Sequence, residues 1–495
     1  MSSLKNKFIY EAYSLILKIR KLTELNQPQL KKSRSHFFNK QAKMLIVTSI
    51  IIGILLVSSF AFLQKKGDSK STFPQSTDMP DTTPSTTIDP TATPIVKGDT
   101  GSSKSLPITF PSYAPLQPTP VPTPKPPGVI ETAQEINATI WRSIAQNAWN
   151  YYQPGVGVNE DNGLPAIPFT DWDLGVYIQA LIDASKIGLI DNGTDWDFVA
   201  RISKIMTFLQ TRELNTNGYP FWFYQPDGNN FHEISDTAKV PVDCVDTGRL
   251  FVALNNLRTY DSRYNENISK IVYNRSNYAA LVPSINSGSY SEVSIYAYYV
   301  DSGFASFWPE LSGAPKRIMD NIFNSGNITT NENATLPLSA ITGDPLYCSI
   351  FELNNNDSRL LALGKEVYLA HEAYFNATGN YRAFGEGPSN SKSYQWGWEW
   401  VVLPDNRTWV SLNSNDQNMD APPVIYTKIA FSFLALYNTP FAINMSVYLE
   451  RNLPEPYWGY YDGVDEAGNS LQRGDSLTNS LILDAAVYFL KHNPE

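Results

Sequence analysis

The sequence predicts a mainly α-helical body, arranged as a toroid, behind one transmembrane helix and a disordered linker. Three observations predict this organisation. Residues 44–63 form an uncharged, apolar run of twenty residues. Residues 64–128 are rich in Pro, Ser and Thr. Residues 129–495 contain several stretches of helical periodicity joined by long aromatic loops. The length of 495 residues leaves room for two or three domains or for one large helical domain.

The apolar run Met44–Leu63 matches the ~20 residues that a helix needs to cross ~30 Å of hydrocarbon. A cleavable signal peptide has a shorter apolar region near the start of the chain, whereas 43 residues precede this one. Residues 1–43 hold ten Lys and Arg against two Asp and Glu. The positive-inside rule therefore predicts a cytoplasmic N-terminal tail, one contact with the lipid bilayer through Met44–Leu63, and a C-terminal domain outside the cytoplasm. The basic tail fits either an amphipathic helix on the inner leaflet or a loose charged tail.

The linker precedes a change in composition near Val129. Residues 67–128 contain 14 of the 34 prolines, and 115–127 are typical of polyproline II. Such a segment buries too little apolar surface to offset its ordering entropy, so we expect a semi-rigid spacer. Residues 129–495 contain 22 basic against 41 acidic residues. That excludes nucleic acid as a partner, because phosphate neutralisation needs clustered Lys and Arg.

Helical periodicity recurs along the body, and long loops separate the predicted helices. The loops 215–246, 384–404 and 458–474 are rich in Gly, Asn, Asp, Trp and Tyr, and loops of this length carry function or their own small sheets. We therefore expect a toroid with a site at one end; the alternative of an elongated repeat lacks a fixed period. The predicted helices are 136–152, 172–190, 197–209, 248–257, 357–378, 424–436 and 478–490.

Three phrases occur in order along the body: TDWDLGVYIQALIDASKIGLI (170–190), NGYPFWFYQPDG (217–228) and VDCVDTGRLFVAL (242–254). Together they resemble domain-of-unknown-function family 3131, which is similar to the glucoamylase-like group that includes endo-β-1,2-glucanases. The resemblance covers roughly 135–492 and implies a six-hairpin (α/α)6 toroid. Cys244 stands where the wider group has Ser, and Arg249 where it has Asn. The family phrase makes Arg249 a candidate substrate contact.

Cleavage of a glycosidic bond needs a protonated carboxyl and a second carboxylate. Asp173 lies in the first phrase beside Trp172, and Asp246 lies in the third. Both, like Asp171, are alternatively helix caps. Glu386 lies between two glycines, with a solvated loop as its alternative. Glu399 lies among three tryptophans, with an Arg-paired strand position as its alternative. These four, Asp173, Asp246, Glu386 and Glu399, are the predicted catalytic set, and the weaker candidates are Glu292, Asp301, Asp420 and Asp462.

Aromatic side chains in the loops are the material for stacking on sugar rings. Each of them alone fits core packing as well, but their concentration in the loops favours a glycan site. The predicted sugar-binding set is Trp172, Trp222, Tyr224, Trp396, Trp398 and Trp458, with Arg249.

The composition also limits the other kinds of site. Two Cys and four His exclude a disulfide scaffold and disfavour a His-rich metal site. Whether Cys244 and Cys348 pair stays open. The loops 215–218 and 413–420 hold oxygen ligands without the spacing of a calcium loop, so no metal or cofactor is predicted. Ten N-x-S/T sequons beyond the linker suit a glycoprotein outside the cytoplasm.

The sequence leaves three functions open. The first is a membrane-anchored glycoside hydrolase that acts on a cell-envelope or extracellular oligo- or polysaccharide. The second is a non-catalytic glycan-binding protein on the same fold, because fold does not dictate function. The third, a polysaccharide lyase, depends on His232 and has the weakest support.

Overall fold

The structure is a computed structural model that describes residues 127–231, 243–286, 293–353, 357–391, 395–471 and 473–493. By its contacts the chain divides into Met1–Asp99 and Thr100–Glu495, and every described residue belongs to the second unit. None of the helices in these ranges is both long and apolar enough to span a bilayer. The predicted anchor Met44–Leu63 and nearly all of the linker 64–128 lie outside the described residues.

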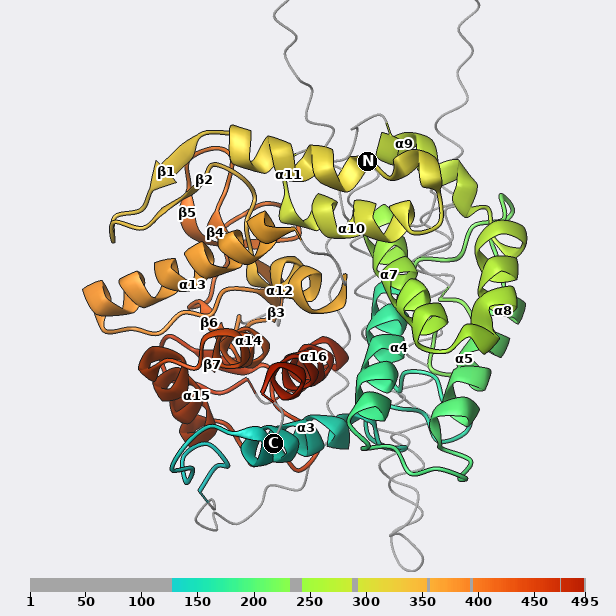
Figure 1. The fold of residues 1–495 in the computed structure, drawn as a ribbon, viewed down its shortest axis with the longest axis horizontal. Helices are drawn as coiled ribbons and strands as arrows, with labels where there is room; N and C mark the ends of the chain where they lie inside the picture. Colours follow the sequence, from blue (N-terminus) through green and yellow to red (C-terminus); the bar gives the residue numbers. More distant parts are fainter. Residues whose placement is uncertain are drawn as a thin grey trace, which may run out of the picture. The chain divides into compact units, whose positions relative to one another are not determined.

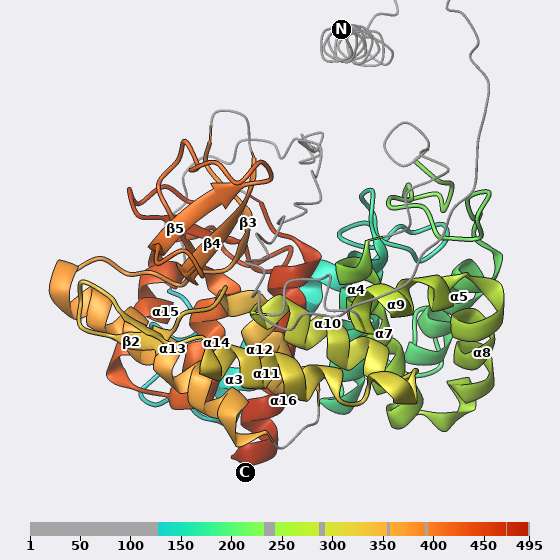
Figure 2. The same ribbon diagram turned by 90° about the horizontal axis from the view of Figure 1, so that it is seen from above.

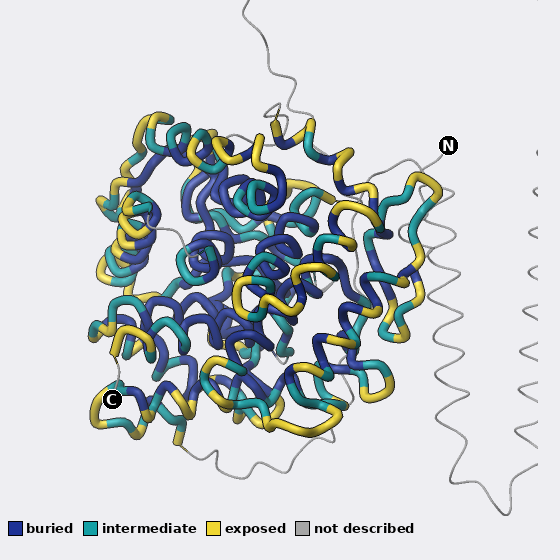
Figure 3. The backbone as a smooth tube through the Cα atoms, turned by 45° about the vertical axis from the view of Figure 1, so that its right-hand side comes forward, coloured by how far each residue is buried: buried dark blue, intermediate teal, exposed yellow. Residues whose placement is uncertain are grey.

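Six helices of the described body form a closed inner ring, in which each contacts the next and the last returns to the first (Figure 1). Most of their residues are buried, as expected of helices in the interior of a large domain, and Figure 3 shows buried segments gathered in the middle of the helical body. The ring consists of α4 (Asp171–Lys186), α7 (Cys244–Tyr260), α10 (Ile295–Ala305), α12 (Gly343–Glu352), α14 (Thr427–Tyr437) and α16 (Ser476–His492).

The outer helices bury one face each, so their sequences are amphipathic. Helix α11, for example, buries Ala314, Ile318, Met319 and Ile322 at helical spacing. The outer set is α3 (Ala138–Trp149), α5 (Phe198–Thr211), α8 (Asn265–Ser269) with the π-helical turn η3 (Lys270–Arg275), α11 (Ala314–Asn324), α13 (Ser358–Thr378) and α15 (Pro440–Asn452). Short helical turns at η1 (Asn150–Tyr152), η2 (Ser262–Tyr264), η4 (Tyr278–Leu281), α9 (Val282–Asn286) and η5 (Pro309–Leu311) complete the connections.

Three small antiparallel sheets lie in the connections. Two of them use residues of the predicted long loops 384–404 and 458–474, and the third, at 327–337, lies outside the predicted loops. Strand β1 (Asn327–Thr329) pairs with β2 (Thr335–Pro337), and β6 (Val424–Tyr426) pairs with β7 (Gly463–Asp465). The largest sheet has the order β3 (Glu386–Pro388), β4 (Trp396–Val402), β5 (Thr408–Asn413). Figure 2 shows it standing off one side of the helical ring.

Four of the Asn- and Asp-rich turns share one hydrogen-bond pattern. In each, a side-chain oxygen accepts from the backbone N–H groups two and four residues later, and the third residue on is left-handed. For Asp465 the donors are Ala467 and Asn469, at 3.0 and 2.8 Å. The bonding oxygens therefore shape turns, which gives the loops at 215–218 and 413–420 a structural role. The four turns start at Asn215, Thr330, Asn413 and Asp465.

Most of the predicted helices are confirmed, with small shifts at their ends. The run at 424–436 begins as strand β6, and its helix starts only at Thr427. Helices α10 and α12 of the ring and α11 and α15 of the outer set were not predicted. Cys244 and Cys348 are both free thiols.

A buried polar network connects the inner helices α4, α7, α12 and α16. Asn256 donates to Gln179 Oε1 at 2.9 Å and to the Glu352 carbonyl at 3.0 Å. Gln179 donates to Asp183 at 2.8 Å and to Asp484 at 3.3 Å. The carboxyl groups of Asp183 and Asp484 also hydrogen-bond to one another, which requires a proton between them.

Substitution of Asp484 by Asn is expected to stabilise the fold at alkaline pH. Burial raises the pKa of Asp484 well above its usual range, and the charges of Glu352 and Asp183 add to this effect. Its contribution to stability is therefore complete below the unfolded pKa of ~3.9 and is lost as the pH rises toward the folded value. The Asn side chain still donates a hydrogen bond to Asp183 but does not ionise, so this contribution to stability is not lost as the pH rises. Melting curves should show a gain of at least ~1 kcal/mol at pH 8 and little at pH 4; a gain independent of pH would contradict this assignment.

Candidate active site

Glu386 is a buried acid at the edge of the three-stranded sheet. Its side chain is 7% exposed, accepts a hydrogen bond from the Tyr296 hydroxyl of α10 and bonds the side chain of Trp398. Burial raises the pKa of Glu386 to about 7, and the charge of Asp344 adds to this effect. A carboxyl with this pKa holds its proton near neutral pH, as a general acid must. The solvated-loop alternative for Glu386 is therefore wrong.

The backbone of Glu386 is held by two buried ions. Its N–H donates to Asp344 Oδ2 at 2.6 Å, and its carbonyl accepts from Lys428 Nζ at 2.6 Å. Asp344 and Lys428 are themselves an ion pair at 2.7 Å, and both side chains are fully buried. No sequence motif singled out either residue.

Glu399 lies on the opposite face of the same sheet. Glu386 pairs directly with Trp398 across β3 and β4, and successive residues of a strand face opposite sides. Glu399 instead accepts from the Val424 N–H at 2.7 Å and from Ser411 at 3.3 Å. These contacts assign it to sheet packing and separate it from Glu386. The predicted alternative for Glu399 was a strand position paired with Arg. The strand is confirmed and the charge of Arg382 acts on Glu399, but its hydrogen bonds come from Ser411 and Val424.

Asp173 lies in the first turn of helix α4. Its charge interacts with those of Asp246 and Asp475, and these three acids, with Glu386 and Asp462, are called the carboxylate cluster below. It forms a capping box with Thr170, whose N–H donates to Asp173 Oδ2 at 2.9 Å. Burial raises the pKa of Asp173 to about 6, against the bonds from Thr170, and the charge of Asp475 raises it too. The neighbouring Asp171 forms a buried ion pair with Arg212 and accepts from Tyr278 at 2.9 Å, so it anchors the helix start. The N-cap itself is Thr170, not Asp171.

Asp246 lies in the first turn of α7, whose N-cap is Asp243, so the cap alternative for Asp246 is wrong. Trp222 Nε1 donates to Asp246 at 3.1 Å, and Thr170 also bonds its side chain. Burial raises the pKa of Asp246 well above its usual range, and the charges of Asp243 and Asp173 add to the effect. Asp246 thus lies close enough to Asp173 for the two charges to interact.

Asp462 and Asp475 join the cluster from the segment before α16. Asp475 caps the helix by accepting from the Thr478 N–H at 2.7 Å, and Asp462 accepts from Thr478 Oγ1 at 2.8 Å. Asp462 was one of the weaker candidates from the sequence. Asp475 was not a candidate, because an Asp directly before an apolar helix is already accounted for as its N-cap. Charge from Asp475 acts on Asp173 and on Lys428, which bonds Glu386.

Aromatic rings connect Glu386 with Asp173. Tyr296 lies between Trp172 of α4, with ring centroids 6.3 Å apart, and Trp400 of β4, at 5.9 Å. Trp396 and Trp398 are partly exposed on the same face of β4 as Glu386, and Arg473 lies 5.9 Å from the Trp396 ring. The partly exposed Trp222 contacts Asp246, and Trp458 is 42% exposed beside Tyr457.

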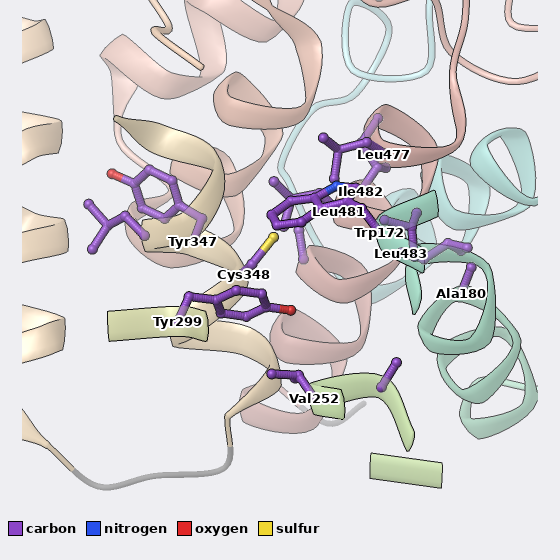
Figure 4. Packing of buried hydrophobic residues seen from close by; sticks show 14 of the residues in the cluster. Trp172, Ala180, Val252, Tyr299, Tyr347, Cys348, Leu477, Leu481, Ile482 and Leu483 are labelled. Atoms are coloured by element: carbon purple, nitrogen blue, oxygen red, sulfur yellow. The ribbon is translucent and has the colours of Figure 1, made fainter. Parts of the chain in front are cut away.

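Three of the predicted sugar contacts are buried in the protein. Tyr224 is fully buried, and its hydroxyl donates to the Glu213 carbonyl at 2.8 Å. Trp172 packs within the core (Figure 4), where its ring also approaches those of Tyr296 and Tyr299. Arg249 is fully buried and forms an ion pair with Glu352 and a hydrogen bond to Tyr299. Tyr224 and Arg249 are therefore not placed to contact a substrate.

Other candidates lie elsewhere or outside the described residues. His232 and Glu292 are not among the described positions. His371 is a buried structural residue, whose ring bonds the Val367 carbonyl and the Phe384 N–H; burial lowers its pKa to about 4. Asp301 lies buried in α10, and Asp420 is an exposed loop residue. Across the described ranges, no three His, Cys, Asp or Glu residues are grouped as a metal site.

The arrangement brings a protonated acid, an acid that ionises near pH 6 and several aromatic faces to one end of the ring. Among the described residues, three buried polar atoms here have no hydrogen-bond partner: Trp172 Nε1, Asp462 Oδ2 and Asp475 Oδ2. Buried polar atoms normally have partners, so a hydroxyl-rich ligand or water suits this site chemically.

Solved structures with a similar arrangement include three glucanases. An endo-β-1,2-glucanase from Talaromyces funiculosus in complex with sophorose has 10% identity and a TM-score of 0.50, over 74% of this chain and 86% of its own. A β-1,2-glucanase from Parabacteroides distasonis has 14% identity and a TM-score of 0.49, over 73% of this chain and 58% of its own. An endo-β-1,2-glucanase from Chitinophaga pinensis has 13% identity and a TM-score of 0.47, over 72% and 94%. The chain thus spans less than two thirds of the Parabacteroides enzyme.

At these identities the Talaromyces structure supports the helical toroid fold and nothing further. No curated protein matches the chain. The sequence model for proteins of unknown function DUF3131 matches residues 143–492, which include nearly all of the helical ring and the carboxylates described above. The chain therefore belongs to the DUF3131 family.

Proposed function

We propose that the protein is a membrane-anchored glycoside hydrolase that acts on a neutral oligo- or polysaccharide outside the cytoplasm. The observation that carries this proposal is Glu386, a carboxyl buried between Tyr296 and Trp398 with a pKa of about 7. The strongly acidic body suits a neutral glycan better than an acidic polymer, because like charges repel.

The geometry favours one assignment of roles. Glu386 donates a proton to the leaving oxygen, because its environment keeps it protonated near neutrality. Asp173 acts as the second carboxylate: both of its hydrogen bonds to Thr170 use Oδ2, and the side chain is partly exposed. Asp246 is less suited as a base, because Trp222 and Thr170 bond its side chain and its pKa is raised well above the usual range.

The sugar stacks on the aromatic face that carries the acid. Trp396 and Trp398 present partly exposed rings on this face, and aromatic faces pack well against the apolar faces of sugar rings. The polar atoms without partners on Trp172, Asp462 and Asp475 would bond sugar hydroxyls or the attacking water. Trp172 lies on α4, and Asp462 and Asp475 lie on the segment before α16, so a bound ring would connect these two parts of the chain.

The dependence of kcat/KM on pH is expected to be a narrow bell-shaped curve. Asp173 must be ionised, so kcat/KM rises through its pKa of about 6. Glu386 must be protonated, so kcat/KM falls through its pKa of about 7. Initial rates between pH 4 and 9 should therefore peak between the two values. A rate that continues to rise above pH 8 would contradict the assignment of Glu386 as the acid.

The direct test is a screen of the full-length protein in detergent against α- and β-glucans, with product detection by mass and reducing ends. β-1,2-Glucan is the first substrate to test, because the Talaromyces enzyme holds sophorose. Turnover by the parent protein supports the proposal. Binding without turnover would instead identify a non-catalytic glycan-binding protein on this fold.

The membrane anchor and the location are part of the proposal and rest on the sequence. The uncharged run Met44–Leu63 follows the basic tail 1–43, which favours a cytoplasmic N-terminus. Protease added to intact cells or spheroplasts should then remove residues 64–495 and leave the tail. Full protection of the body would contradict this orientation.

A further inference from the structure

The main chain of Glu386 is held by a buried ion pair that belongs to two other helices. Asp344 comes from α12 and accepts the Glu386 N–H, and Lys428 comes from α14 and donates to the Glu386 carbonyl, each at 2.6 Å. The two ions contact one another at 2.7 Å. Both backbone polar groups of Glu386, in the short edge strand β3, are therefore hydrogen-bonded to the ion pair.

The close packing around the Glu386 backbone explains the glycines on either side of this residue. A Cβ at Gly385 would overlap Asp344 Oδ2, and a Cβ at Gly387, where φ is +157°, would come within 2.7 Å of the Tyr426 ring. Glycine therefore allows Asp344 and Tyr426 to approach the strand at the residues that flank the acid. The sequence RAFGEGP follows from this packing.

A buried ion pair is a costly way to hold a strand. Removing two charges from water costs several kcal/mol each, and well-packed apolar residues often serve stability as well. Nearby backbone contacts are made without ions: the Gly343 N–H donates to the Phe384 carbonyl at 3.1 Å, and the Tyr426 N–H to the Ala383 carbonyl at 3.1 Å. The residue whose backbone the two ions bind is Glu386, which also carries the buried acid. This points to a role of the ion pair in positioning the Glu386 carboxyl.

We propose that Asp344 and Lys428 are positioning residues that fix the main chain of Glu386, so that its carboxyl meets Tyr296 and Trp398. The two ions also place opposite charges beside that carboxyl. The inference rests on the proposed role of Glu386 for its importance to catalysis, but the effect of the ion pair on Glu386 can be measured without any substrate.

The charges that act around Glu386 come from four elements. Tyr296 of α10 donates to its carboxyl. Asp344 of α12 raises the pKa of Glu386, and Lys428 of α14 lowers it. Asp462 and Asp475, before α16, are close enough to interact with Lys428. Loss of one member of the ion pair therefore leaves the other uncompensated beside Glu386.

The test is the titration of Glu386 in the full-length protein in detergent, by infrared difference spectra between each protein and its Glu386→Gln counterpart. Asp344→Asn should lower the pKa of Glu386 and Lys428→Met should raise it, each by about one pH unit or more, since a charge within ~4–6 Å has effects of that size. Glu399→Gln, which removes a buried carboxyl on the other face of the sheet, is the matched control and should leave the titration unchanged. Shifts in the same direction, or none, would overturn the proposal.

A second measurement covers the case in which a single variant does not fold. The double variant Asp344→Leu/Lys428→Met keeps the net charge of the pair and removes both hydrogen bonds to the Glu386 main chain, and Lys428→Arg keeps the cation. Hydrogen exchange of the Glu386 amide should accelerate at least tenfold in the double variant and much less in Lys428→Arg. Unchanged protection in the double variant would overturn the positioning role. If the pKa of Glu386 and the exchange of its amide change as expected, but neither the parent protein nor any variant hydrolyses a glycan, the positioning role of the ion pair stands and the proposed hydrolase is contradicted.

Discussion

Replacement of Glu386 by Gln is expected to lower the turnover of a hydrolysed glycan by about 10²–10⁴-fold with little change in affinity, because the variant loses a proton donor and keeps the shape of the side chain. Gln still accepts from Tyr296, so the local packing is preserved. The measurement is kcat and KM on the first active substrate, with binding followed by calorimetry.

Glu399→Gln is the matched control for this prediction. It makes the same chemical change one residue beyond Trp398, on the other face of the sheet, where Glu399 bonds Val424 and Ser411. We expect its kcat to stay within a few-fold of the parent. An equal loss in the two variants would mean that the effect of Glu386→Gln comes from damage to the sheet.

The second large effect is expected at Arg249. Its guanidinium pairs with Glu352 and Tyr299 in the middle of the ring, where all three side chains are buried. Arg249→Met leaves the Glu352 carboxylate buried without its counter-ion, which typically costs about 3–5 kcal/mol. Urea denaturation should show this loss, and Glu352→Gln in the same chain should recover much of it.

The family phrase placed Arg249 at a substrate-binding position, and the same variants test that interpretation. A structural Arg249 affects stability and leaves glycan affinity in the folded protein unchanged. Weaker glycan binding by Arg249→Met with unaltered stability would return Arg249 to the substrate site.

Much of the fold is readable from local sequence. The period of apolar residues located α3, α5 and α13 to within a few residues, because an amphipathic helix records its buried face in the chain. Helices α10 and α12 were not located in this way, since they are buried on almost every side and α12 carries the buried acids Asp344 and Glu352. The Asn- and Asp-rich turns were visible as loops, but their shared hydrogen-bond pattern was not.

The sequence by itself determined that acids and tryptophans gather in the long loops, and it identified Glu386 and Asp173 among four candidates. Only the tertiary structure decided which acids meet. Glu386 and Glu399 are thirteen residues apart in the chain, yet the antiparallel register places Glu386 opposite Trp398 and turns Glu399 to the other face. Asp344, Lys428 and Asp475 reach the cluster from segments 42 and more residues away from Glu386. Register and long-range packing of this kind depend on the whole ring, so no local pattern in the chain records them.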